Sequence, residues 1–108
     1  MRKTLAALVV VLLATAAAAG VGHARRAGDT AVIAVPAVEF AQRESGPLLL
    51  DAFVPSGPGP HPAVVLVHGG GWRSGSRGGW VRTGRALARE GLAAFTIDYR
   101  LSGVAEFP

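Results

Sequence analysis

Apolar and polar positions alternate over residues 38–42, and a more apolar run follows over residues 48–54. The Ser45-Gly46-Pro47 segment between them is typical of a turn. The pattern predicts two strands joined by a turn, which fits a hairpin at the edge of a sheet.

The second half of the chain shows a different pattern. Residues 63–67 are apolar at every position, as in a strand covered on both faces inside a parallel sheet. Residues 80–90 place small and apolar side chains on one stripe and three arginines on another, which predicts an amphipathic helix, capped by Gly91. A further apolar run over residues 92–97 completes a βαβ unit, so the predicted fold class is α/β. The proline-rich segment 55–62 predicts a surface loop.

The chain begins with a leader-like segment. An almost uninterrupted apolar run over residues 5–19 follows the basic Arg2-Lys3 pair and precedes small and then basic residues. We therefore expect residues 1–24 to be a secretory signal peptide. Cleavage after Ala19 also fits, but we favour Ala24 because the charge change begins directly after it. An uncleaved membrane anchor is the alternative, since the run approaches the ~20 residues of a spanning helix.

The composition narrows the function classes. Lysine and arginine number 11 against 7 aspartates and glutamates, a formal net charge of +4 over 108 residues. The basic residues form no dense block, so we expect no nucleic-acid partner. The absence of cysteine from the sequence excludes disulfides, zinc-thiolate sites and thiol catalysis. The length fits one domain, expected over residues 37–108 after an aperiodic linker at residues 25–36.

The segment most informative about chemistry is His68-Gly69-Gly70-Gly71-Trp72, directly after the apolar strand and before the helix. Three successive glycines remove every Cβ from the turn and let a bound group approach the main-chain amides. Sheets of this class bind ligands at the carboxyl ends of strands, and amides near a helix N-terminus favour negative charge. We therefore expect these amides to bind an anion or a developing oxyanion.

Phosphate binding is a competing interpretation of the same glycines. A Walker loop would need Lys and then Ser or Thr where this chain has Ser76-Arg77, and a dinucleotide fingerprint would need glycine in place of Ser74. Both nucleotide interpretations fail, and we expect no cofactor and no metal ion. A phosphate held by Arg73 and Arg77 beside the glycines remains an alternative.

Several motifs together resemble a known family. They are residues 64–72, which contain HGGGW, then Ser74-Gly75-Ser76, Asp98-Tyr99-Arg100-Leu101-Ser102 and Phe107-Pro108. In this combination the chain resembles the N-terminal part of an α/β-hydrolase of the esterase/lipase group, in the HGGGW branch of bacterial feruloyl-esterase-like and arylformamidase-like proteins. The resemblance covers residues 38–108 and implies an incomplete α/β-hydrolase sheet, with an edge hairpin followed by the βαβ unit.

The resemblance also implies roles within the glycine segment. The amides of Gly70 and Gly71 would form the oxyanion hole, with Gly69 in reserve. His68 would support the loop by hydrogen bonding rather than act as the catalytic base. Trp72 would pack against the fold or form a pocket wall.

The motif around Asp98 is implied to be structural. The triad acid of the family comes much later in the chain, so Asp98 would not be that acid, and Tyr99 and Arg100 would brace the strand end. In the strand order of the family, residues 63–67 lie between residues 92–97 and the nucleophile strand.

The sequence supplies no nucleophile. None of the five serines lies within Gly-x-Ser-x-Gly, and His68 is the last histidine. We therefore expect an N-terminal fragment, inactive by itself, of a secreted serine hydrolase that acts on small-molecule carboxylic esters. We expect no stable membrane association after signal cleavage. The alternative function is a non-catalytic α/β module that binds a carboxylate or polysaccharide group at the glycines.

Overall fold

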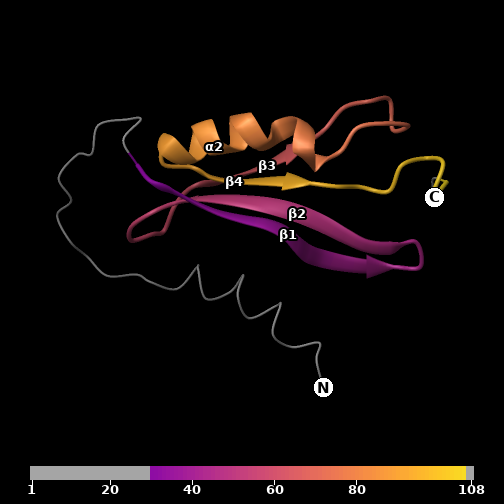
Figure 1. Cartoon of the computed structure of the whole chain (residues 1–108), viewed down its shortest axis with the longest axis horizontal. Helices are drawn as coiled ribbons and strands as arrows, with labels where there is room; N and C mark the ends of the chain where they lie inside the picture. Colours follow the sequence, from indigo (N-terminus) through magenta and orange to yellow (C-terminus); the bar gives the residue numbers. More distant parts are fainter. Residues whose placement is uncertain (1–29, 107–108) are drawn as a thin grey trace, which may run out of the picture.

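The structure is a computed structural model that describes residues 30–106. Its elements are β1 (Val32–Arg43), β2 (Gly46–Pro55), β3 (Ala63–Val67), the 3-10 helix η1 (Arg77–Trp80), α2 (Val81–Arg89) and β4 (Ala93–Ile97). The strands form one sheet in the order β1-β2-β4-β3. The helix α2 lies along one face of this sheet (Figure 1).

β1 and β2 form the predicted edge hairpin. They pair antiparallel from Val32 to Arg43, with register shifts between Val35 and Val38 and between Glu39 and Ala41. β1 already begins at Val32, so the expectation that residues 32–36 belong to a linker is wrong. The side chains of residues 33–37 are all exposed, so this segment does not need the alternation of apolar and polar residues that marks a half-buried strand. Hydrogen-bonded pairing with the β2 backbone holds it in the sheet instead.

β3, α2 and β4 form the predicted βαβ unit, in which β3 and β4 pair in parallel. Gly84 and Ala88 of α2 are buried, as the helical stripe predicts. Gly84 allows a close approach to Phe53 of β2, because a Cβ at residue 84 would lie 2.5 Å from Cδ2 of the phenylalanine ring. Phe53, Ala88 and Ala94 form the buried core between helix and sheet.

The predicted glycine, Gly91, caps the C-terminal end of α2. Gly91 has a φ of +94°, a conformation that favours glycine. The amide of Leu92 donates to the carbonyl of Leu87 at 3.0 Å, and the amide of Gly91 donates to the carbonyl of Ala88 at 3.1 Å. These two bonds make a Schellman motif, which satisfies the last carbonyls of α2 and turns the chain directly into β4.

β3 lies at the edge of the sheet that residues 30–106 form, not in its interior. Val64 and Leu66 pack against the core beneath α2, whereas Val65 and Val67 are 57% and 54% exposed. The apolar pattern predicts cover on both faces, and the described residues supply it on one. The position of β3 beside β4 agrees with the strand order that the resemblance implies.

The predicted proline-rich loop joins β2 to β3 over residues 56–62. In the part of the chain that the structure describes, no helix has the length and apolar character needed to cross a membrane. The predicted signal peptide and both of its cleavage sites lie outside the described residues, as do Phe107 and Pro108.

Candidate active site

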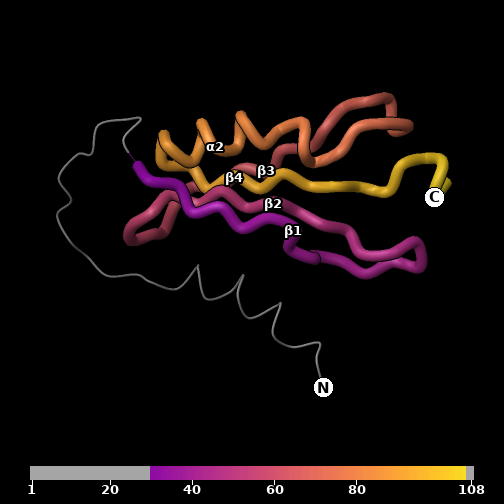
Figure 2. The backbone as a smooth tube through the Cα atoms, in the orientation of Figure 1, coloured from indigo at the N-terminus to yellow at the C-terminus, as the bar shows by residue number. Residues whose placement is uncertain are grey.

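The glycine loop, defined here as residues 68–76, leaves the carboxyl end of β3. Residues 98–106 leave the carboxyl end of β4, which runs parallel to β3. Both segments therefore extend from the same end of the sheet (Figure 2). They are joined where the amide of Ser102 donates to the carbonyl of Trp72 at 2.8 Å. The βαβ unit thus brings together two motifs that are far apart in the sequence.

His68 lies at the base of the glycine loop and is only 7% exposed. Its ring stacks on the ring of Tyr99, with centroids 4.3 Å apart. Its Nδ1 lies 2.8 Å from the carbonyl oxygen of Gly69, and its own carbonyl accepts a bond of 3.0 Å from the Tyr99 hydroxyl. An Nδ1–H donor satisfies the Gly69 carbonyl and commits this nitrogen to the loop.

The glycines adopt conformations that other residues rarely reach. Gly70 and Gly71 have φ angles of +123° and +60°. The carbonyl of Gly70 turns back to accept the amides of Arg73 at 3.1 Å and Ser74 at 3.2 Å. A Cβ on Gly70 would lie within 2.1 Å of the Ser74 carbonyl oxygen, whereas a Cβ on Gly71 would meet nothing within 4 Å. Gly70 is therefore required for the tight turn, and Gly71 faces open space.

The amides of Gly69, Gly70 and Gly71 form an uncommitted donor set. None of them donates a hydrogen bond to an acceptor within residues 30–106. Successive uncommitted amides beside left-handed backbone make a concavity suited to an anion. The structure therefore leaves these donors available to a bound group.

Trp72 follows the glycines with a φ of +60° and a side chain that is 74% exposed. A bulky residue in this region of backbone space is strained, and such strain concentrates at functional sites. Trp72 lines an open hollow of about 470 Å³ together with Arg100, Ser102, Ala105 and Glu106. Of the two roles expected for this residue, packing and pocket wall, its exposure favours the wall.

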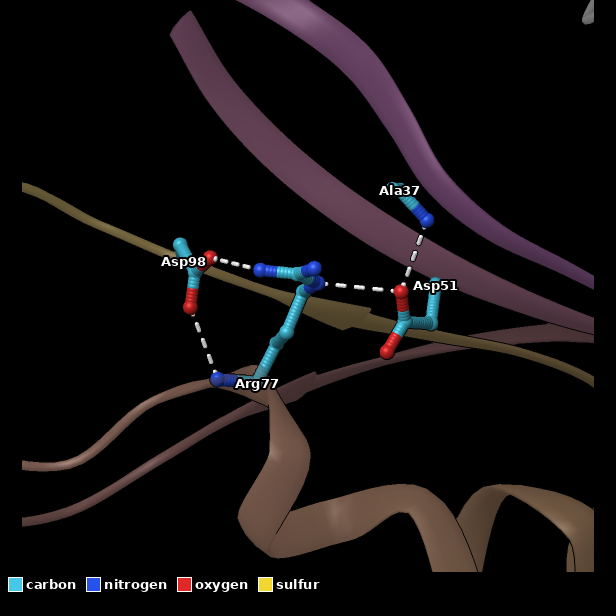
Figure 3. A network of polar contacts seen from close by, with 4 residues as sticks. All are labelled: Ala37, Asp51, Arg77 and Asp98. Carbon is cyan, nitrogen blue, oxygen red and sulfur yellow. Dashed lines mark hydrogen bonds and ion pairs between the residues drawn. The ribbon is translucent and has the colours of Figure 1, made fainter. Parts of the chain in front are cut away.

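Arg77 begins η1 immediately after the glycine loop and binds two carboxylates (Figure 3). Its Nε donates to Oδ1 of Asp51 at 2.9 Å, and its Nη1 donates to Oδ2 of Asp98. Its backbone amide donates to Oδ1 of Asp98 at 2.7 Å. The hydrogen bond to Asp51 and then that to Asp98 raise the pKa of Arg77, so the guanidinium stays charged.

This network bears on two sequence-based expectations. Asp98, expected to be structural, contacts Arg77 through both carboxylate oxygens. The Arg77 guanidinium is directed at Asp51 and Asp98, so the arrangement gives no support to a phosphate held by Arg73 and Arg77. Asp51 itself was missed, although it is the single charge within the apolar run of residues 48–54 and is 9% exposed.

The described residues show no serine activated by a histidine. Within residues 30–106, no hydrogen bond joins the two residue types, and the Ser74 hydroxyl donates to the carbonyl of Gly70 at 3.3 Å. What the structure assembles is a set of amides, a buried histidine beneath them and the Arg77 network beside them.

Comparisons with known proteins show which family the chain belongs to. The BD-FAE family model matches residues 50–108, more than half of the chain. A solved structure described as a bacterial heroin esterase matches 88% of the chain with a TM-score of 0.52 and 23% sequence identity, a likeness of fold alone. The chain spans 27% of that esterase. None of the curated proteins matches. The chain belongs to the BD-FAE family, a hydrolase family of esterase type, and its sheet and helix match the N-terminal part of an α/β-hydrolase fold.

Proposed function

We propose that the chain supplies the oxyanion-hole part of a secreted serine hydrolase that acts on small-molecule carboxylic esters. The observation that carries the proposal is the set of uncommitted amides at Gly69, Gly70 and Gly71, at the carboxyl end of a strand. Membership of an esterase-type family supports the same reaction class. Gly70 and Gly71 are the proposed donors, and Gly69 is the reserve.

In the proposed reaction, a serine hydroxyl adds to the ester carbonyl carbon while a base takes the hydroxyl proton. The carbonyl electron pair moves to oxygen, and the amides of the glycine loop stabilise this oxyanion together with the amide after the nucleophile. Collapse expels the protonated alcohol and leaves an acyl-enzyme, which water hydrolyses through a second oxyanion. Losing one such donor raises the barrier by about 2.7–4 kcal/mol. No nucleophile, acid or base is assigned within residues 30–106.

His68 and Trp72 are given supporting roles in this proposal. The Nδ1 of His68 is committed to the Gly69 carbonyl and its ring is covered by Tyr99, an arrangement that favours loop support over proton transfer. Trp72 would form a wall of the substrate pocket, because it lines the open hollow beside the loop.

The test compares two substitutions at Gly71 in the complete gene product. Gly71→Pro removes the amide donor and also distorts the loop, because proline cannot adopt the φ of +60° at this position. Gly71→Ala keeps the amide and places its Cβ in open space at the same strained φ. With a short-chain nitrophenyl ester, Gly71→Pro should lower kcat by about 10²-fold or more relative to Gly71→Ala. Equal rates for the two variants would reject the donor role.

A non-catalytic module that binds carboxylates is the second candidate, favoured by Arg100, which lines the same hollow as Trp72, although Glu106 lines it too. An active-site phosphonate distinguishes the two. Stoichiometric labelling of a serine in the complete gene product supports the hydrolase, whereas carboxylate binding without labelling or turnover supports the module.

Secretion is part of the proposal and rests on residues 1–24. The exported protein should begin at Arg25 when its N-terminus is sequenced. A membrane-bound product that retains residues 1–24 would support the anchor instead.

A further inference from the structure

We propose that Arg77 is a positioning residue that fixes the far end of the glycine loop and thereby the direction of the Gly70 and Gly71 amides. The inference rests on the oxyanion role proposed for those amides. Arg77 directly follows the loop, and only 25% of its side chain is exposed. It contacts Asp51 on β2 and Asp98 at the end of β4, so it ties the loop to two strands at once (Figure 3).

The end of β4 holds both ends of the glycine loop. Tyr99 holds the beginning, because its hydroxyl donates to the His68 carbonyl at 3.0 Å and its ring stacks on the imidazole. Asp98 holds the end, because its two oxygens accept the amide and the guanidinium of Arg77. Adjacent residues of one strand end therefore set the distance that the loop must span.

A displacement at Arg77 would pass to the amides through direct contacts. Gly75 lies against the start of the loop so closely that a Cβ there would be 2.5 Å from the His68 Nδ1 and 2.6 Å from the Gly69 carbonyl oxygen. The preceding Ser74 donates its amide to the Gly70 carbonyl at 3.2 Å. If Arg77 were released, Gly75 and Ser74 would be free to move away, and the peptide planes of Gly69 and Gly70 would rotate.

The network extends to the outer hairpin through Asp51. The Oδ1 of Asp51 accepts both the Arg77 Nε and the amide of Ala37, each at 2.9 Å. Ala37 lies at the first register shift of β1 and has a φ of +56°. The planar guanidinium offers donors in fixed directions to two separate carboxylates, which the single ammonium of lysine cannot reproduce. The chemistry of the site therefore calls for arginine.

The test uses Arg77→Gln and Arg77→Lys in the complete gene product, with Arg82→Gln as the control for loss of one charge. Arg82 is exposed on α2. Arg77→Gln should lower kcat by about 10- to 100-fold with little change in KM, because misplaced amides weaken transition-state binding selectively. The kcat of Arg77→Lys should lie between those of Arg77→Gln and the parent enzyme, and the kcat of Arg82→Gln should equal that of the parent enzyme. Hydrogen exchange of a peptide covering residues 68–77 should accelerate in Arg77→Gln and not in Arg82→Gln.

A combined variant separates positioning from general structural damage. If Arg77 acts through the oxyanion hole, Arg77→Gln should add almost nothing to the loss caused by Gly71→Pro, since the hole is already disrupted. Multiplied losses, an unchanged kcat in Arg77→Gln, or a loss expressed only in KM would each overturn the inference. Asp51→Asn, which leaves the contacts between Arg77 and Asp98 in place, should show a smaller loss of kcat with the same exchange signature, so the inference stays testable if Arg77→Gln does not fold. An unchanged kcat in Gly71→Pro would instead overturn the proposed function, and this inference with it.

Discussion

The ring of His68 stacks on the ring of Tyr99 with the planes inclined by 14°, and the Tyr99 hydroxyl donates to the carbonyl of the same histidine. Two different contacts therefore join the end of β4 to the start of the glycine loop. One is aromatic contact and the other is a single hydrogen bond, so substitutions at Tyr99 can remove them separately.

Tyr99→Phe should keep the stacking and lose only the hydrogen bond. We expect the free energy of unfolding to fall by about 0.5–1.5 kcal/mol in urea denaturation of the complete gene product. Tyr99→Leu removes both contacts and should cost about 0.5–1.5 kcal/mol more, the size of an aromatic pair. Equal stability of the two variants would mean that the stacking contributes nothing.

Gly84→Ala should destabilise the protein although alanine favours helices. A Cβ at residue 84 would lie 2.5 Å from Cδ2 of Phe53, so the helix must move away from the sheet, at a cost of about 1–3 kcal/mol. Gly79→Ala is the matched control, because a Cβ there meets nothing within 4 Å, and it should be neutral or stabilise by about 0.4–1 kcal/mol. In a Phe53→Leu background the penalty of Gly84→Ala should shrink; an unchanged penalty would exclude the clash as its cause.

The βαβ unit could be predicted because its signals are local. An uninterrupted apolar run identifies β3, a helical stripe identifies α2, and the left-handed turn after the helix demands the glycine at residue 91. The start of β1 could not be predicted, because residues 32–35 are held in a strand by pairing with β2 and carry no alternating pattern of their own.

Part of the candidate site could be predicted from the sequence and part could not. The glycines stand out in the sequence. Arg77, in contrast, is separated along the chain by 26 positions from Asp51 and by 21 positions from Asp98, and no local pattern encodes contacts over such separations. Asp51 was the available signal, since an isolated charge in an apolar run needs a partner when buried. Nothing in the sequence indicates the left-handed backbone conformation of Trp72, because the motif predicts such conformations only for its glycines.

Gly75→Ala should disturb the glycine loop more than its backbone strain alone requires. Gly75 and Gly46 both have a positive φ, at +98° and +113°, so alanine is strained at either position. Only at Gly75 would the new Cβ also meet the His68 ring and the Gly69 carbonyl; at Gly46 it meets nothing within 4 Å. We expect Gly75→Ala to lose about 1–3 kcal/mol more than Gly46→Ala in urea denaturation. A loss no larger than that of Gly46→Ala would show that the loop yields freely at residue 75.

β3 should promote association when residues 25–108 are expressed alone. It lies at the edge of the sheet formed by residues 30–106, and its outer face exposes Val65 and Val67. An apolar edge strand without charge or proline is a template for pairing with another chain. We expect these residues to aggregate, and we expect Val65→Lys to lower the aggregated fraction measured by light scattering, because a charge on an edge strand opposes such pairing.

The control for this last prediction is Val104→Lys. Val104 is 61% exposed but lies outside the sheet, so a lysine there adds the same charge without touching β3 and should leave aggregation unchanged. Equal improvement by both lysines would mean that net charge, rather than strand pairing, controls association. A monomeric parent chain with a cooperative thermal transition and slow exchange at every amide of residues 64–67 would contradict the open-edge interpretation. Pairing with β4 protects only those amides of β3 that face β4, so the remaining amides of an open edge should exchange fast.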